Sequence, residues 1–443
     1  CALPIYEGVD IPEVDTVVLL RPTESPVVFL QQIGRGLRLA QGKESVLILD
    51  FIGAHRSEYR IDAKFSALAG AGRAEVMQNV EQGFPYLPSG SAIKLDAMSR
   101  DYVLDLMKRQ IKPSWSKLVL EVSQAGFESL DEYLLFSGRE LFEVYGKSGR
   151  TWLGAARDAG LVDMEINDID AYLLKRVNKL THIDDNARLA GYAKLLTPSY
   201  PKWHGLSDAD KRLASMLFWN LFDDGKRPWD GDEWESIDEA FDCLRGSKAF
   251  IWEIRNLFEH LKTKLKFKAL PFVLTAGEHP FLLHATYSRS ELLGGLGFAR
   301  LPNSSLYEGP RRGVSAAVEG VYHIQEAHLD VFFVNLNKSD AISESIRYRD
   351  YAVSPTLFHW ESQGKTSDTS ETGRRYIGQR TSKHDVVIAV REKALGPNGT
   401  IHFKLLGPAD YVSHSGSRPI SILWRLREPM DLDSFQIAAA AKV

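Results

Sequence analysis

The chain has 443 residues, of which 44% are hydrophobic and 25% are charged, and its formal net charge at pH 7 is −4. This length is enough for about two to four domains with separate cores. The small net charge excludes a protein that binds nucleic acid over its whole surface, so any such binding must come from local patches. The two cysteines, Cys1 and Cys243, cannot build a disulfide framework or a zinc site, so we expect a protein of the reducing cytoplasm. No apolar run reaches the length of a membrane span, so we expect no membrane contact.

The first predicted unit is a strand, a helix and a second strand. Val14–Leu20 is a short apolar run rich in β-branched residues, as in the strands of a parallel sheet. Ser25 followed by Pro26 is typical of a helix N-cap and first turn, and the helix is predicted to end at Gly34. Because Ser45–Phe51 is a second apolar run, the pattern predicts a βαβ unit of a parallel sheet.

Two polar clusters lie at the ends of this unit. Glu7–Pro12 reads EGVDIP, and Gln31–Arg38 reads QQIGRGLR. Arg35 and Arg38 are three positions apart at a glycine-rich helix end, so both forked guanidinium groups can point to one side, which suits a polyphosphate. The two segments resemble motifs V and VI of the second RecA-like lobe of superfamily 2 (DEAD/DEAH-like) helicases. A basic helix end that complements the helix dipole is the alternative interpretation.

The resemblance implies a role for each matching residue. Arg35 and Arg38 would be arginine fingers that reach the γ-phosphate of ATP, a contribution of roughly 10³- to 10⁵-fold in phosphoryl-transfer enzymes. Asp10 would lie near the ribose and couple the nucleotide to the nucleic acid, and the backbone of Gly8 would approach a nucleic-acid phosphate. The nucleotide-binding positions implied in this way are Asp10, Gln31 and Gly34.

A phosphate-binding P-loop is absent from the sequence. The nearest run, Gly36–Ser45, has Glu44 after Gly42 and Lys43 where a P-loop has serine or threonine. Since the chain begins at Cys1, just before motif V, we expect it to be the C-terminal part of a longer helicase. The first RecA-like lobe, which would hold ATP and Mg²⁺, and an upstream nuclease domain are the expected missing partners, and the chain alone is expected not to hydrolyse ATP.

The rest of the chain changes from helical to strand-like periodicity. Apolar residues recur at spacings of three and four up to about residue 265, and β-branched or alternating runs follow from about residue 271. The expected fold class is therefore multidomain: a partial α/β RecA-like lobe, an all-α connector and a β-rich C-terminal domain. The expected boundaries are residues 1–72 for the lobe, 73–95 for a linker, 96–265 for the connector and 266–443 for the β-rich domain.

A second candidate site lies in the β-rich domain. A strand-like run ends at Gln363 and is followed by a polar loop, residues 364–373. The loop is flanked by side chains of three kinds: hydrogen-bond donors for base edges, an aromatic ring for stacking, and guanidinium groups for phosphates. This combination is typical of proteins that read DNA bases, including a flipped base. The residues are His359, Trp360, Gln363, Arg374 and Arg375. An ordinary strand end with a solvated loop is the alternative.

Residues 270–430 are similar to an uncharacterised module that follows helicase lobes in bacterial restriction and defence proteins. This resemblance implies a role with foreign or modified DNA but supplies no catalytic residues. His323, Glu326 and His328 come close to an H-x-x-E-H motif but have one residue too many and lie in a strand-like run, so no metal site is predicted. Three hypotheses follow: an ATP-dependent DNA helicase or translocase, a non-catalytic DNA-binding module that could read modified DNA, and a nuclease in the β-rich domain.

Overall fold

The computed structural model divides the chain into two compact units. The first comprises Cys1–Gly146 with Gly154–Asp163, and the second comprises Lys147–Leu153 with Met164–Val443. The structure describes residues 13–19, 29, 31–33, 40, 42–50, 80, 114–127, 129–137, 139–146, 149–265, 270–275, 277–314, 320–336, 350–396 and 399–441. The expected boundary between residues 265 and 266 falls inside the second unit, because helices and sheet pack together there.

Two short strands begin the described part of the first unit. Strand β1 (Thr16–Leu19) pairs in parallel with β2 (Leu47–Asp50), with Val17 opposite Ile48. Val17 and Leu19 are buried in a small core that also contains Phe29 and Ile33, and residues 31–33 are helical. The parallel pairing predicted from the sequence is thus confirmed, whereas its assignment to a RecA-like lobe stays a prediction.

Helices form most of the chain between residues 115 and 263, as the periodicity predicts. In the first unit they begin with α5 (Trp115–Ala125), α6 (Leu130–Ser137) and α7 (Leu141–Val144), followed by α8 (Trp152–Asp158), which spans the division between the units. The second unit has α9 (Asp168–Leu174), α10 (Asn186–Leu195), α11 (Asp208–Leu221), α12 (Ile237–Gly246) and α13 (Lys248–Thr263), with 3₁₀ turns at Val177–Leu180 and Trp203–Gly205. Side-chain caps start several of these helices; for example, the hydroxyl of Ser207 accepts the backbone N–H of Asp210 at the start of α11.

The tryptophans of this region are core anchors. Trp152, Trp219 and Trp234 are almost fully buried, and Trp203 is 5% exposed. An exposed stacking platform for single strands would need these rings at the surface, so for these four positions burial favours a packing role.

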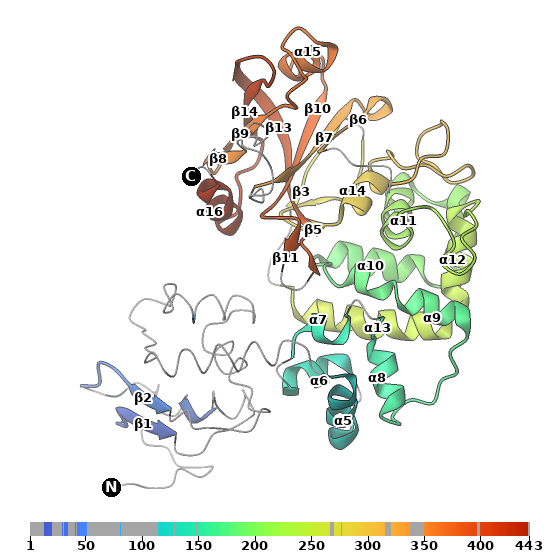
Figure 1. The fold of residues 1–443 in the computed structure, drawn as a ribbon, viewed down its shortest axis with the longest axis vertical. Helices are drawn as coiled ribbons and strands as arrows, with labels where there is room; N and C mark the ends of the chain where they lie inside the picture. Colours follow the sequence, from blue (N-terminus) through green and yellow to red (C-terminus); the bar gives the residue numbers. More distant parts are fainter. Residues whose placement is uncertain are drawn as a thin grey trace. The chain divides into compact units, whose positions relative to one another are not determined.

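Helix α14 (Arg289–Gly295) joins the helices to the sheet and packs on α11 (Figure 1). A Cβ atom at Gly294 would lie 2.8 Å from the backbone oxygen of Ser215, and one at Gly295 would lie 2.5 Å from Met216. The two glycines therefore allow a close approach that any larger residue would prevent.

An eight-stranded mixed sheet dominates the rest of the second unit. Its order is β6-β7-β10-β13-β14-β9-β8, with β5 paired to β13; β7 and β10 are parallel and the other neighbours are antiparallel. The strands are β5 (Thr286–Tyr287), β6 (Val321–Ile324), β7 (Leu329–Asn335), β8 (Tyr351–Ser354), β9 (Leu357–Glu361), β10 (Asp385–Arg391), β13 (Phe403–Ser415) and β14 (Ser421–Leu426). Two small hairpins add β3 (Leu270–Pro271) with β4 (Leu282–Leu283), and β11 (Leu395–Gly396) with β12 (Gly399–Thr400).

The sheet curls around its own core. Four strand spacings separate β7 from β9, which would be roughly 19 Å in a flat sheet. The rings of Phe332 on β7 and Trp360 on β9 are nevertheless stacked with their centroids 4.2 Å apart. Trp424 and Tyr376 complete this aromatic centre, Tyr376 from helix α15 (Glu371–Ile377). Helix α16 (Leu432–Ala440) packs against β8.

No helix among the described residues is long and apolar enough to cross a membrane.

Candidate functional site

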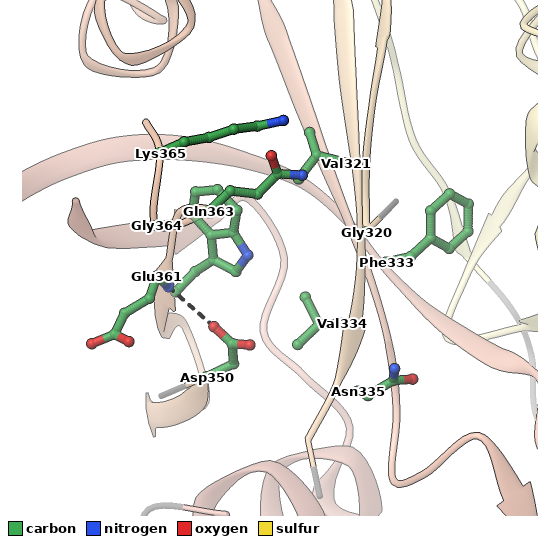
Figure 2. A pocket seen from close by; sticks show the side chains of 11 residues that line it. Gly320, Val321, Phe333, Val334, Asn335, Asp350, Glu361, Gln363, Gly364 and Lys365 are labelled. Atoms are coloured by element: carbon green, nitrogen blue, oxygen red, sulfur yellow. Dashed lines mark hydrogen bonds between the residues drawn. The ribbon is translucent and has the colours of Figure 1, made fainter. Parts of the chain in front are cut away.

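A pocket of about 540 Å³ opens where the curled sheet brings β6 and β7 near the end of β9. Val334 and Trp360 supply apolar surface to it, and Asn335, Gln363 and Lys365 supply neutral or positive polar groups. The full lining is Gly320, Val321, Phe333, Val334, Asn335, Asp350, Trp360, Glu361, Gln363, Gly364 and Lys365. In Figure 2, Gln363 and Lys365 extend from the segment after β9, and the backbone N–H of Glu361 donates to Asp350 Oδ1 at 3.0 Å. The pocket thus combines an apolar wall with a few hydrogen-bonding groups, as small-ligand sites do.

The segment that carries Gln363 and Lys365 is fixed at both ends. Buried Ser362 exchanges two hydrogen bonds with Ile420: its hydroxyl accepts the Ile420 N–H at 2.9 Å, and its own N–H donates to the Ile420 carbonyl at 3.0 Å. Eight residues later, the hydroxyl of Ser370 donates to the carbonyl of Ser367 at 2.6 Å and caps α15. The polar side chains at positions 363 and 365 therefore project from an anchored turn.

The strand periodicity separates the two aromatic candidates of β9. His359 lies opposite Leu423, and its ring stacks on Tyr351 with centroids 4.7 Å apart. Trp360 points the other way, is 5% exposed and stacks on Phe332. This corrects the expectation that Trp360 offers a free ring for a base, because successive side chains of a strand point to opposite faces and this one faces the core.

The three remaining candidates of the β-rich domain are also dispersed. Gln363 lines the pocket, and Arg374 is exposed on α15. Arg375 is half-buried and holds the carboxylate of Asp330 through Nε at 2.8 Å and Nη2 at 3.2 Å. Its expected role as a phosphate-binding fork is therefore corrected, since the edge formed by Nε and Nη2 is already engaged by a carboxylate of the same domain.

The candidates of the N-terminal motifs are mostly beyond what the structure describes. Gly8, Asp10, Gly34, Arg35 and Arg38 lie outside the described residues. Gln31 is described; it is exposed, in the helical stretch of residues 31–33. Its predicted contact with a nucleotide, like the roles of the other five, stays a prediction.

Asp330 is the centre of a second polar cluster, which the sequence search missed. Its Oδ1 lies 3.1 Å from His323 Nδ1, and its Oδ2 lies 2.8 Å from His384 Nε2. His323 is on β6, Asp330 is the second residue of β7, and His384 directly precedes β10. With Arg375 from α15, four elements contribute one side chain each. A linear motif search cannot find such a set, although a polar residue at the start of an otherwise apolar strand is a weak signal of it.

The partners that the sequence suggested for His323 are elsewhere. Glu326 forms an ion pair with Arg300 at 2.6 Å, and His328 has φ of 47° in the turn between β6 and β7. Neither residue is among the partners of His323 that the structure shows, and His323 contacts Asp330 instead.

The charge state of Asp330 follows from its surroundings. Burial alone would raise the pKa of its carboxyl, but the hydrogen bonds from His323, His384 and Arg375 outweigh burial and hold the pKa well below its usual range. The carboxylate is therefore ionised at neutral pH.

Comparisons with known proteins connect parts of this chain to two groups. Residues 298–437 match the family described as "Domain of unknown function (DUF3427)". Over 48 residues the chain is 52% identical to "Putative ATP-dependent helicase IRC3" of Saccharomyces cerevisiae (strain ATCC 204508 / S288c), a match that covers 11% of this chain and 7% of that protein. Part of the chain is thus similar to a helicase.

The family match covers the structural features described above. Residues 298–437 include the pocket, the Asp330 cluster and every strand of the large sheet except β5. Since the chain matches only 7% of the helicase's length, that protein's activity as a whole cannot be transferred by the likeness. The helicase-related context and the uncharacterised domain are the firm results of the comparisons.

Proposed function

We propose that the chain is the C-terminal part of an ATP-dependent DNA helicase or translocase of a bacterial restriction or phage-defence system. The 52% identity over 48 residues to a protein named as a helicase carries this proposal. The parallel pair β1 and β2, with helical residues between them in the sequence, supports it because a RecA-like lobe contains such a unit. The proposed architecture is a partial RecA-like lobe, a helical connector and a β-rich domain.

In this proposal the N-terminal motifs serve the motor. Arg35 and Arg38 complete an ATP site whose P-loop and Mg²⁺ belong to the first RecA-like lobe, and Asp10, Gln31 and Gly34 lie at the nucleotide. Gly8 lies at a nucleic-acid phosphate. Closure of the two lobes on ATP would then move the chain along DNA, while the chain without the first lobe would not turn over ATP.

The pocket is the proposed DNA contact of the β-rich domain. The amide of Gln363 can both donate to and accept from a base edge, and the ammonium of Lys365 suits a phosphate. A volume of about 540 Å³ lies within the range of roughly 300–1,000 Å³ that is typical of ligand pockets.

A non-catalytic DNA-binding module is the second candidate. The pocket favours it, because it lies within residues 298–437, a region that matches a domain without an assigned activity. In that case the pocket would read DNA, modified bases included, without ATP hydrolysis. A nuclease in the same domain is the weaker alternative, since neither the pocket lining nor the sequence motifs supply a recognised nuclease centre.

The proposed contact can be tested with the whole chain and fluorescence anisotropy of labelled duplex DNA. We expect the double variant Gln363→Ala, Lys365→Ala to bind about 30-fold more weakly, because one neutral and one charge-assisted hydrogen bond together contribute at least about 2 kcal/mol. Lys262→Ala removes one exposed charge on α13 and should bind as the wild type does. Equal affinity of all three proteins would show that the pocket does not contact DNA.

A further inference from the structure

We propose that His323, Asp330 and His384 form a binding site for one divalent transition-metal ion, with Zn²⁺ the best match. Two imidazole nitrogens and a carboxylate oxygen are a donor set that Zn²⁺ uses in proteins. The inference rests on the geometry of the Asp330 cluster alone and does not depend on the proposed DNA function.

The three ligand atoms already lie close together. His323 Nδ1, His384 Nε2 and an Asp330 oxygen all lie within 4.8 Å of one another. Around a tetrahedral ion with bonds of about 2.1 Å, ligand atoms are roughly 3.4 Å apart. His323 Nδ1 lies 3.1 Å from Asp330 Oδ1 and His384 Nε2 lies 2.8 Å from Asp330 Oδ2, both near that value. Small movements of the two rings and of the carboxylate would therefore bring three ligand atoms to one ion. Their centroids are 5.4 Å apart and the ring planes are inclined by 37°.

The backbone that carries these ligands is held by the centre of the sheet. β7 and β10 are parallel neighbours, and the Asp385 N–H donates to the His328 carbonyl at 2.8 Å, which fixes the chain beside His384. Gln379 donates from Nε2 to the His384 carbonyl at 2.8 Å and accepts the Tyr411 N–H at 3.1 Å. Such outer contacts orient metal ligands and contribute to affinity.

Arg375 fits the site as an outer partner of the carboxylate. In known metal centres the ligating carboxylate is itself hydrogen-bonded, and Arg375 makes two such bonds to Asp330. An ion would replace the two imidazole contacts of Asp330 and leave the arginine fork in place. The positive charge of Arg375 offsets the single negative charge of Asp330. Binding would therefore depend on ligation by the two neutral imidazole nitrogens and the carboxylate oxygen.

Three protein ligands leave one position of a tetrahedral zinc ion open. Structural zinc sites fill all four positions with protein groups, whereas catalytic sites keep one position for water or a ligand oxygen. The side chain of His323 is 36% exposed, so the cluster is accessible from solvent, and Asp330 is completely buried behind it. The site is therefore of the open type, suited to an anionic oxygen such as that of a phosphate.

The test is metal stoichiometry and affinity of the whole, untagged chain. Cys1→Ser and Cys243→Ser in the background remove both thiols as competing ligands. After chelator treatment, one Zn²⁺ per chain is expected by elemental analysis, and Co²⁺ titration should give the visible absorption of a tetrahedral complex. His384→Gln is expected to weaken Co²⁺ binding at least tenfold, and His323→Gln, at the exposed edge of the cluster, should do the same if His384→Gln fails to fold.

His359→Gln is the matched control, because this histidine is on β9 of the same sheet and stacks on Tyr351, outside the cluster. It should bind Co²⁺ with the wild-type affinity and spectrum. Absence of stoichiometric metal in the wild type, or equal Co²⁺ affinity in His323→Gln and wild type, would show that the cluster is a hydrogen-bond network around Asp330 and would overturn the proposal.

Discussion

Replacing Arg38 by alanine, in the helicase that joins this chain to a P-loop lobe, is expected to lower DNA-stimulated ATP hydrolysis by about 10³-fold or more. The guanidinium would stabilise the charge that develops on the transferred γ-phosphate, and alanine provides nothing in its place. DNA binding should change little, because the residue is proposed to contact the nucleotide. Steady-state ATP turnover with and without DNA, together with DNA anisotropy, measures both quantities.

Arg157→Ala is the control for this variant, since Arg157 is an exposed arginine of α8 remote in sequence from the proposed motifs. Its turnover should equal that of the wild type. Unchanged turnover in Arg38→Ala would remove the arginine-finger assignment. An equal loss in both arginine variants would instead point to a general effect of lost positive charge.

The replacement of Arg188 by methionine is expected to destabilise the second unit by about 3–5 kcal/mol, the usual cost of removing one partner of a buried ion pair. Arg188 is fully buried, contacts Asp185, and donates to Glu291 at 3.1 Å and Asp184 at 3.0 Å. Its guanidinium also lies 4.0 Å from the ring centroid of Tyr287. The network joins α10 to α14 and β5, so its loss weakens the contact between the helices and the sheet.

The effect of Arg188→Met comes from the carboxylates left behind. Burial would raise the pKa of Glu291, but the charges of His182 and Arg188 outweigh burial and hold it well below its usual range. Stability from this group is therefore present above the unfolded pKa of about 4.5 and decreases as the pH falls below it. Denaturant unfolding at pH 7 measures the loss, and the double variant Arg188→Met, Glu291→Gln should recover part of it. The control is Lys202→Ala, an exposed position whose free energy of unfolding should stay within about 0.5 kcal/mol of the wild type. An equally small change in Arg188→Met would contradict this account.

The local elements of this fold are predictable from the sequence because short-range rules determine them. The runs DVFFVNL and HDVVIAV form β7 and β10, the RSELLGG segment forms α14, and Ser207 caps α11. The division of the chain at residue 265 stays a prediction, since it relies on a change in periodicity and both sides of it belong to one compact unit. The contacts between α11 and α14 and between Arg188 and Glu291 cross that position, and such contacts leave no periodic signal.

The site was predicted less completely than the elements, for two different reasons. The opposite directions of His359 and Trp360 could have been read from the alternation of LFHWE, which places every second residue in the core. The Asp330 cluster could not have been predicted in this way, because His384 and Arg375 are 54 and 45 positions away from Asp330. The parallel pairing of β7 with β10 brings His384 to Asp330, and the placement of α15 brings Arg375 there. Strand order of this kind is a tertiary property.

The central claim, that this chain handles DNA, is tested most directly by the salt dependence of duplex binding by the whole protein. Proteins that neutralise DNA phosphates release counterions, so the logarithm of the association constant falls linearly with the logarithm of salt concentration. We expect binding at about 50 mM salt, with a slope of roughly −3 or steeper, as for three or more phosphate contacts. Absence of binding at that concentration, or an association constant that does not change with salt, would contradict the account.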